Sequence, residues 1–163
     1  MKLFYLWTVA FFVLDALPTV AQVPTLGDFP KVDVKIAIDS DSYKDPNAVH
    51  ITITITNKLK SKQRILFGGK SWGLCGQVSD KQGNSVTQLQ CRSVLESQVY
   101  TETMLKKIYR YLKPGRSLSA TYYLTQIIVI NFANNNQLPP GDYSLSISYF
   151  NNDSNKVDFT IRR

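Results

Sequence analysis

Residues 138–150 read LPPGDYSLSISYF, and this stretch predicts how the chain folds. Pro139 to Gly141 form a turn signal, because proline fixes one backbone dihedral and glycine tolerates conformations closed to other residues. After the turn, polar residues alternate with apolar ones, which are Tyr143, Leu145, Ile147 and Tyr149. This period of two indicates a β-strand with one face in a hydrophobic core.

The same period recurs along the chain. The stretch VHITITITN at 49–57 places Val49, Ile51, Ile53 and Ile55 on one face and threonines on the other. Further strands are predicted at 32–38, 65–69, 72–78, 86–91, 118–124 and 157–161, with a turn at 39–47 and an apolar run at 127–132. The pattern predicts an all-β fold, an antiparallel immunoglobulin-like β-sandwich of about 7–9 strands. A short helix or an irregular segment is expected between Leu95 and Lys106.

The first residues have the features of a secretory signal peptide. Lys2 gives a basic start, Leu3 to Leu14 is almost wholly apolar, and small residues precede a predicted cleavage between Ala21 and Gln22. The apolar run is shorter than the roughly 20 residues of a membrane-spanning helix. We therefore expect a secreted or periplasmic protein with no stable membrane insertion after signal removal. Its parts would be the signal at 1–21, an extended lead at 22–31 and one β-sandwich domain at 32–163.

Two cysteines, Cys75 and Cys91, remain after that cleavage, and export favours a disulfide between them. They are symmetric about Gly83, so a hairpin turning at 81–84 would place them opposite each other. Such a bridge contributes about 3 kcal/mol to stability.

The chain is basic, with 19 Lys and Arg against 12 Asp and Glu and a net charge of +7. In an exported protein this charge favours an acidic protein, an anionic glycan or a bacterial envelope over nucleic acid. Cations and aromatic residues cluster in three loops, and this combination is typical of protein-binding surfaces. The candidate partner-binding residues are Lys58, Lys60, Lys62, Arg64, Lys70, Trp72, Lys106, Lys107, Tyr109, Arg110 and Tyr111, with Lys113 and Arg116 close by. Solvated lysines and tyrosines packed in a sheet are the alternative reading.

The sequence gives little reason to expect catalysis. Residues 69–73 match the G-x-S-x-G pattern around a nucleophilic serine, but that chemistry needs a histidine that follows the serine. The one histidine, His50, precedes it. Residues 69–71 also resemble the end of a phosphate-binding loop, but Arg64 stands where that loop needs glycine. We expect no enzyme activity and no cofactor.

Two further patterns are weaker. Asp39, Asp41 and Asp45 resemble a calcium loop, although Tyr43 and Lys44 stand at positions where that loop needs an oxygen ligand and a glycine. We therefore predict no metal site. Asn152 begins an Asn-Asp-Ser sequon and is a candidate glycosylation site if the source is eukaryotic.

Four motifs together resemble a known family: ITITITNK, VSDKQGNSV, LKPGRSLSATYYL and LPPGDYSLSISY. Their order is similar to that in the bacterial proteinase-inhibitor family called BsuPI. It is also similar to that in the β-sandwich domain preceding deuterolysin-like metallopeptidases. The resemblance spans roughly residues 32–161 and implies an immunoglobulin-like sandwich. No inhibitory residue carries over from it, because no reactive-site motif is present.

These observations predict a protein-binding β-sandwich, with a proteinase inhibitor that acts by loop occlusion as the specific hypothesis. The partner would be a protease or an acidic protein. The alternative is a structural, immunity or glycan-binding module of the envelope or the extracellular space, without catalysis. The loops at 58–64, 68–72 and 106–116 would carry the interaction.

Overall fold

The computed structural model describes residues 30–67, 73–87, 109–128 and 138–162, and this part of the chain is all-β as predicted. Its elements in chain order are β1 (Asp33–Ile38), β2 (Ser42–Tyr43), the 3₁₀ turn η2 (Pro46–Ala48), β3 (His50–Thr56), β4 (Gln63–Ile65), β5 (Leu74–Asp80), β6 (Arg110–Leu112), β7 (Ser117–Tyr123), the short helix α2 (Leu124–Ile127), β8 (Gly141–Tyr149), β9 (Asn152–Asp153) and β10 (Val157–Ile161). The predicted signal peptide and most of the lead lie outside the described residues, as does the segment between Leu95 and Lys106. No described helix is long and apolar enough to cross a membrane.

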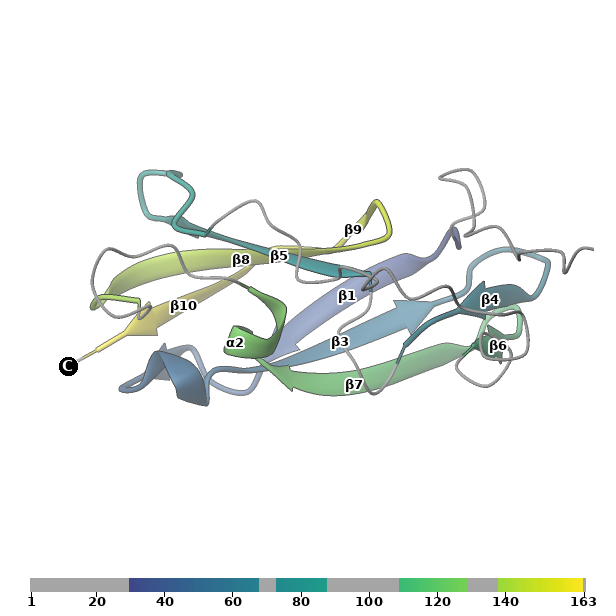
Figure 1. Cartoon of the computed structure of the whole chain (residues 1–163), viewed down its shortest axis with the longest axis horizontal. Helices are drawn as coiled ribbons and strands as arrows, with labels where there is room; N and C mark the ends of the chain where they lie inside the picture. The colour runs from purple at the N-terminus through teal and green to yellow at the C-terminus, as the bar shows by residue number, and fades with distance from the viewer. Residues whose placement is uncertain (1–29, 68–72, 88–108, 129–137, 163) are drawn as a thin grey trace, which may run out of the picture.

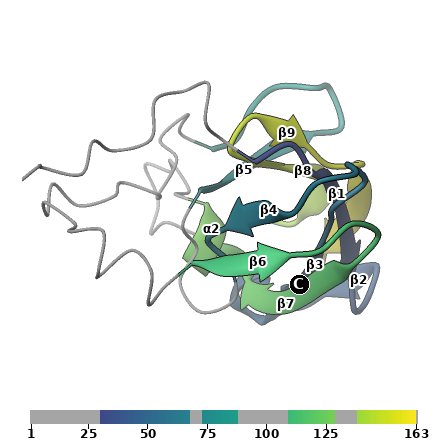
Figure 2. The same ribbon diagram turned by 90° about the vertical axis from the view of Figure 1, so that its right-hand side faces the viewer.

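The strands form two main layers and a small third sheet (Figure 1). One layer has the order β1-β3-β7, and the other has the order β2-β10-β8-β5 with β9 paired to β8. Every strand pair is antiparallel except β2 with β10. The third sheet contains β4 and β6 and lies at one end of the layers, as the end-on view shows (Figure 2). The finer immunoglobulin-like assignment remains a prediction.

The core lies between the two layers, and the central strand β3 contributes most to it. Val49, Ile51, Ile53 and Ile55 are fully buried, and Leu145 of β8 joins them in one cluster of buried side chains. Burying a branched apolar side chain contributes about 1.5–3 kcal/mol. The alternation read from VHITITITN is thus the alternation between core and surface.

The outer face of the β1-β3-β7 sheet is covered with hydroxyl groups. Three pairs of hydroxyl groups, one from β3 and one from β7 in each pair, are hydrogen-bonded at 2.8–3.1 Å; they are Thr52 with Thr121, Thr54 with Ser119 and Thr56 with Ser117. Cross-strand pairs of this kind stabilise a sheet by a few tenths of a kcal/mol up to about 1 kcal/mol each. The threonines are therefore part of the scaffold.

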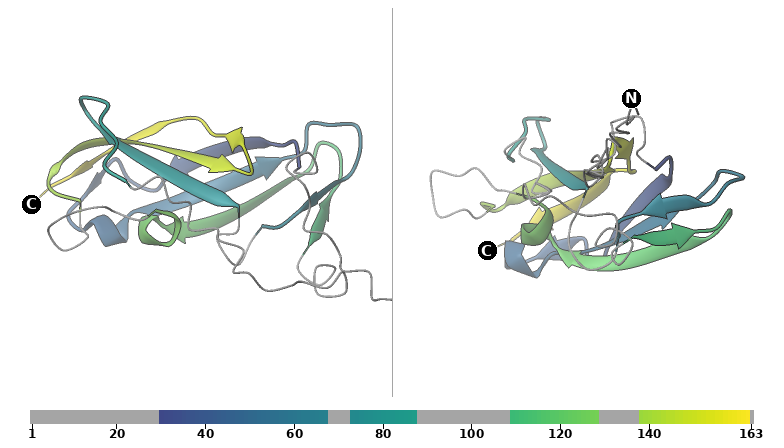
Figure 3. Two further views of the ribbon diagram at one scale, coloured as in Figure 1. Left: turned by 45° about the horizontal axis from the view of Figure 1, so that its top comes forward. Right: turned by 45° about the vertical axis from the view of Figure 1, so that its right-hand side comes forward.

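The stretch at 138–150 folds as predicted. Residues 141–149 form β8, which lies between β5 and β10, and its alternate side chains from Tyr143 to Tyr149 are buried. The Tyr143 hydroxyl donates to the Pro139 carbonyl at 2.8 Å, which ties the turn to the strand that it starts. Figure 3 shows β8 in the middle of its layer.

The predicted turn at 39–47 contains more structure than expected. Ser42 and Tyr43 form β2, which pairs parallel with the last strand, β10. Asp45 then caps η2, because its carboxylate accepts from the Asn47 N–H at 2.8 Å. A two-residue strand has no period to read, so only its partner in β10 defines it.

Several predicted strand ends are shifted by one or two residues, and two differences have a clear cause. The strand expected at 65–69 is β4 at 63–65, because both the N–H and the C=O of Leu66 bond to the Tyr149 hydroxyl at 3.0 Å. These bonds take Leu66 out of the ladder. Leu124, expected as the last inward residue of a strand, instead begins α2. The chain turns there because the Gln126 side chain accepts from the Tyr123 N–H at 2.8 Å.

The predicted turn after β5 is present, while most of the second strand expected at 86–91 lies outside the described residues. Gly83 has a φ of +85°, and its N–H donates to the Asp80 carbonyl at 2.9 Å. Ser79 pairs with Ser85, so the hairpin is centred on residue 82, because (79 + 85)/2 = 82, one residue before the expected centre. Cys75 lies half-buried on β5 and is not a free thiol. Cys91 lies outside the described residues, and the disulfide between the two remains a prediction.

Two asparagine side chains join the layers along the edge of β1. The amide of Asn155 acts as a strand partner for Ile36, accepting from its N–H at 2.9 Å and donating to its C=O at 3.1 Å. Asn152 accepts from the Val32 N–H at 3.1 Å and donates to the Pro30 carbonyl at 2.9 Å. Both asparagines belong to the segment between β8 and β10, so they link the two sheets without a backbone ladder.

Replacing Asn155 by alanine leaves the N–H and C=O of Ile36 without these partners. Because Asn155 is exposed, water can reach both groups, and we expect the free energy of unfolding to fall by about 0.5–1.5 kcal/mol, the usual net contribution of a hydrogen bond. Urea unfolding measures this change, and the neighbouring exposed substitution Lys156→Ala is the control. Equal stability of the two variants would show that the Asn155 bridge is dispensable.

Candidate functional site

The structure brings the two predicted basic loops together at one end of the molecule. Strands β4 and β6 pair, with Arg64 opposite Tyr111 and Ile65 opposite Arg110. Figure 1 shows this pair beside the ends of β3 and β7. We call the cations gathered here the basic end; they are Lys58, Lys60, Lys62, Arg64, Arg110, Lys113 and Arg116, and all are exposed. Residues more than 40 positions apart therefore share one surface.

One buried amide, that of Asn57, holds the basic end in place. This residue follows β3 directly and is fully buried. Its side-chain nitrogen donates to the carbonyls of Ser61 and Leu112, each at 2.8 Å. Its side-chain oxygen accepts from the Leu59 N–H at 2.9 Å. The amide thus ties the turn after β3 to the end of β6.

The backbone of Asn57 adds two more bonds to the same region. Its N–H donates to the Arg116 carbonyl at 3.0 Å, and its carbonyl accepts from the Gly115 N–H at 2.7 Å. Gly115 has a φ of +69°, a conformation that favours glycine. Because every polar group of Asn57 is bonded, both basic loops are fixed relative to the core before any partner binds.

An aromatic and cationic surface lies on the outward side of the β4-β6 pair. The guanidinium carbon of Arg64 lies 4.6 Å from the centre of the Tyr109 ring, a cation–π contact. Burial raises the pKa of Tyr109, and the nearby Arg64 charge opposes that effect. Tyr111, the cross-strand neighbour of Arg64, is 68% exposed. A large aromatic ring this exposed beside cations is typical of a binding surface.

Little of the positive charge is neutralised. Among the described residues, the basic end has one ion pair, Lys58 with Asp33 at 3.0 Å. Lys60, Lys62 and Arg110 reach into solvent without an acidic neighbour in that part of the chain. Among the described residues, the cations of the basic end therefore outnumber their acidic neighbours.

Several predicted site residues cannot be placed. Lys70, Trp72, Lys106 and Lys107 lie outside the described residues, as do Gly69 and Ser71 of the G-x-S-x-G pattern. Of the predicted partner-binding residues, the structure brings seven together: Lys58, Lys60, Lys62, Arg64, Tyr109, Arg110 and Tyr111. Asn57, which positions them, was not singled out, although it ends a strand on the inward face.

The candidate glycosylation site has a structural role. The Asn152 side-chain nitrogen donates to the carbonyls of Pro30, Tyr149 and Phe150 at 2.8–3.0 Å. A glycan on that nitrogen would replace one of its two hydrogens and force the bonds apart. This geometry opposes modification of the folded protein at Asn152.

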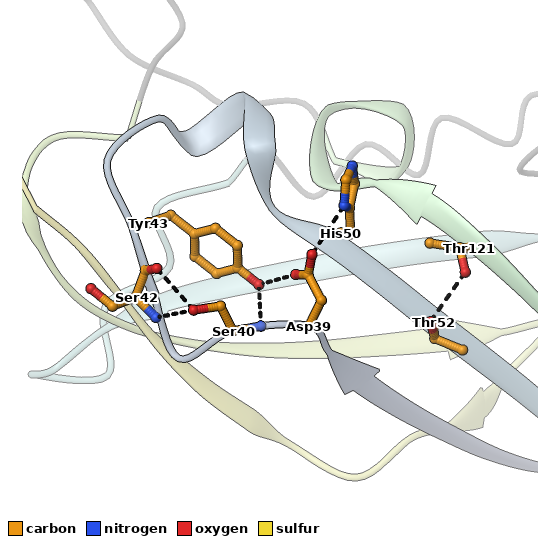
Figure 4. Close-up of polar contacts among 7 residues, drawn as sticks. All are labelled: Asp39, Ser40, Ser42, Tyr43, His50, Thr52 and Thr121. Atoms are coloured by element: carbon orange, nitrogen blue, oxygen red, sulfur yellow. Dashed lines mark hydrogen bonds and ion pairs between the residues drawn. The ribbon is translucent and has the colours of Figure 1, made fainter.

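A second polar cluster surrounds the loop between β1 and β3 (Figure 4). The Tyr43 hydroxyl donates to Asp39, and the Ser40 N–H donates to that hydroxyl at 3.0 Å. His50 Nδ1 lies 3.0 Å from the other Asp39 oxygen. The hydrogen bond from Tyr43, followed by contacts with His50, holds the pKa of Asp39 below its usual value, although burial opposes this shift. Burial, and then Asp39, raises the pKa of Tyr43 to about 12.

This cluster fixes a loop. Tyr43 belongs to β2, so its bond to Asp39 ties β2 to the end of β1, while the backbone of β2 pairs with β10. Asp39 and Asp45, two of the three residues of the calcium-like pattern, are used by Tyr43 and by η2 respectively. In the described ranges no three acidic, histidine or cysteine side chains gather in a metal-binding arrangement.

Acidic side chains line a groove of about 440 Å³ on the other sheet, with the lining carboxylates Asp41, Asp80, Asp142 and Asp158. Hydrogen bonds from Asn84 lower the pKa of Asp80, and Lys81 lies 3.6 Å from Asp142. These residues belong to the loop before β2, the end of β5 and its turn, β8 and β10, near the C-terminus and away from β4 and β6 (Figure 1). The four carboxylates come from separate parts of the sequence, so no local motif indicated the groove.

Comparisons with known proteins assign no family. No family model matches the chain, and no curated protein matches it. A mutant β-glucosidase from Listeria innocua bound to laminaribiose is 9% identical, with a TM-score of 0.46 over 83% of this chain and 16% of that one. An alkylpurine DNA glycosylase from Pseudomonas fluorescens is 10% identical, with a TM-score of 0.44 over 82% and 31%. The chain spans less than a third of either protein, and likeness at this level carries no argument about function.

Replacing Asn57 by aspartate tests the buried amide with almost no change in shape. The new carboxylate would face the carbonyls of Ser61 and Leu112 and could not donate to them. We expect the free energy of unfolding to fall by about 3 kcal/mol at pH 7. The loss should shrink near pH 3, where a protonated acid can donate one bond. Urea unfolding at both pH values measures this, with the exposed change Asn151→Asp as control, and a loss that does not depend on pH would contradict it.

Asp39→Asn should remove a pH-dependent contribution to stability. Because folding lowers the pKa of Asp39, its stabilisation is present above the unfolded value and is lost as the pH falls through the folded value. The variant should be less stable by about 0.5–1 kcal/mol above pH 5, because the pair is exposed to solvent, and the difference should shrink as the pH falls below the ordinary Asp value of about 3.9. Thermal unfolding across that range measures the difference. Asp158→Asn is the control, and a difference that grows toward low pH would refute the assignment.

Proposed function

We propose that this protein is a non-catalytic binding module that holds an acidic protein partner against its basic end. The observation that carries the proposal is the pairing of β4 with β6. That pairing joins two basic loops and places the exposed ring of Tyr111 among their cations. The predicted signal peptide supports a secreted or periplasmic location for this interaction.

Three properties of the site support protein binding. The first is unneutralised charge, which accelerates encounter with an acidic surface. The second is the aromatic and arginine content of the outward face, since these side chains carry much of the energy in protein interfaces. The third is the bonding of Asn57, because loops that are already ordered lose less entropy on association.

The inhibitor hypothesis fits the turn at 58–62. These residues are exposed, and the Asn57 side chain anchors the turn at Leu59 and Ser61. A turn that projects into solvent and keeps its shape is suited to fill the cleft of a protease. A protease with an acidic rim would complement the neighbouring cations.

Charge reversal at the basic end tests the proposal. The triple variant Lys62→Glu, Arg110→Glu and Lys113→Glu alters exposed side chains only. Immobilised poly-L-glutamate serves as the acidic probe, and we expect its affinity to fall about 10–100-fold, at roughly 0.5–1 kcal/mol per charge. The affinity of the parent should also fall when the salt concentration is raised from about 0.05 M to about 0.5 M, because salt screens the attraction between exposed charges.

A matched control reverses the same amount of charge elsewhere. The variant Lys35→Glu, Lys44→Glu and Lys156→Glu replaces three exposed lysines that lie away from the β4-β6 pair. It should bind about as well as the parent. Equal losses in the two triple variants would mean that net charge, and not this site, drives binding. Binding to a sulfated glycan without binding to poly-L-glutamate would instead favour the glycan-binding alternative. A panel of proteases assayed with the parent and the first variant then tests inhibition directly.

A further inference from the structure

A groove of about 580 Å³ adjoins the basic end, and its lining is mostly apolar. Three short segments form it: residues 30–33 before and within β1, Lys58 and Leu59 after β3, and residues 150–152 between β8 and β9. Leu59 is 39% exposed and is one of three large apolar or aromatic side chains exposed in the described part of the chain. We call this feature the side groove.

Hydrogen bonds fix each wall of the side groove. Asn152 bonds to Pro30 and Val32, which ties the first segment to the third. The Leu59 N–H donates to the Asn57 side chain, which ties the second segment to the buried amide. The groove is therefore preformed, and a ligand would not need to order it.

The turn at Phe150 has an uncommon backbone. Phe150 and Asn151 have φ values of 44° and 64°, in the left-handed region that bulky residues rarely enter. Such turns usually use asparagine and glycine. The Phe150 N–H donates to the Gly73 carbonyl at 3.0 Å, and the Phe150 ring packs so closely on Gly73 that a Cβ added to Gly73 would clash with it. Strained positions of this kind cluster at sites of function.

The rim of the side groove is basic and continuous with the basic end. Lys31 and Lys58 line it, and Lys58 is one of the cations of the basic end itself. The Asp33 carboxylate in the lining is paired with Lys58 at 3.0 Å. A partner that lies along the basic end would therefore cross the groove, and an apolar side chain on that partner would meet Leu59 and Phe150.

We infer that the side groove receives a large apolar side chain carried by an acidic segment of the partner. This inference rests on the proposed function and makes it more specific. The cations would select for a negatively charged segment, and the groove would select among such segments for one with a phenylalanine or leucine. Burying one side chain of that size contributes enough to change affinity about tenfold.

Two synthetic peptides of equal length and charge test the inference. Both consist mainly of glutamate, and one carries phenylalanine at the central position where the other carries serine. With the full-length protein in a binding titration, we expect the phenylalanine peptide to bind about tenfold more tightly. Leu59→Ser should remove that preference, and it should not disturb the fold, because the side chain is partly exposed and the Leu59 N–H bond to Asn57 is retained.

Two further variants complete the test. Phe150→Gly removes the ring and suits the positive φ, so it should also reduce the preference while keeping the turn. Tyr123→Ser changes another exposed ring, 49% exposed, at the far end of β7, and it should leave the preference intact.

The outcomes separate the two proposals. Equal binding of both peptides, with loss of both in the charge-reversed triple variant, would overturn the side groove and leave the proposed function standing. Failure of the parent to bind either peptide would overturn both. If Leu59→Ser instead converts a dimer to a monomer in sedimentation, the occupant is a second copy of the chain and the inference is wrong.

Discussion

The inward face of the central strand sets both the core and the site. Positions 49, 51, 53 and 55 place four fully buried apolar side chains between the sheets, and position 57 continues the same face with an asparagine. A buried amide without partners would cost several kcal/mol, so the chain around it must supply hydrogen bonds. The turn after β3 and the segment around β6 supply them. The need to satisfy one polar group at the end of the core therefore fixes the geometry of both basic loops.

The sequence predicted best where a local period or turn motif defines structure. Alternation located β1, β3, β7, β8 and β10, and the Pro-Pro-Gly and Pro-Gly turns were recognisable from residue type. Pairings between distant short segments were not predictable: β2 exists because β10 lies beside it, and β4 ends at Ile65 because the Tyr149 hydroxyl takes both backbone groups of Leu66. The basic composition of the two loops was recognisable from the sequence. Their position side by side was not, because it depends on the β4-β6 pair and on the hydrogen bonds of Asn57. A strand of three residues, such as β4 or β6, is too short for its alternation to predict which strand it pairs with.

Charge is unevenly distributed over the described residues. The basic end lies beside β4 and β6, while most lining carboxylates of the acidic groove lie near the C-terminus. Such a distribution produces an electric dipole, which orients a charged partner during approach as well as attracting it. Screening by salt weakens this orientation over distances beyond about 8–10 Å, so it acts most strongly just before contact.

The asparagine bridges to β1 also affect how this protein meets other copies of itself. An open edge strand is a template on which another chain can add a strand, and this is a common route to aggregation. Here Asn155 occupies the N–H and the C=O of Ile36, and Asn152 occupies the N–H of Val32. An incoming strand would have to displace both side chains before it could pair along β1. The same two bridges that join the sheets thus hinder the addition of another chain along β1.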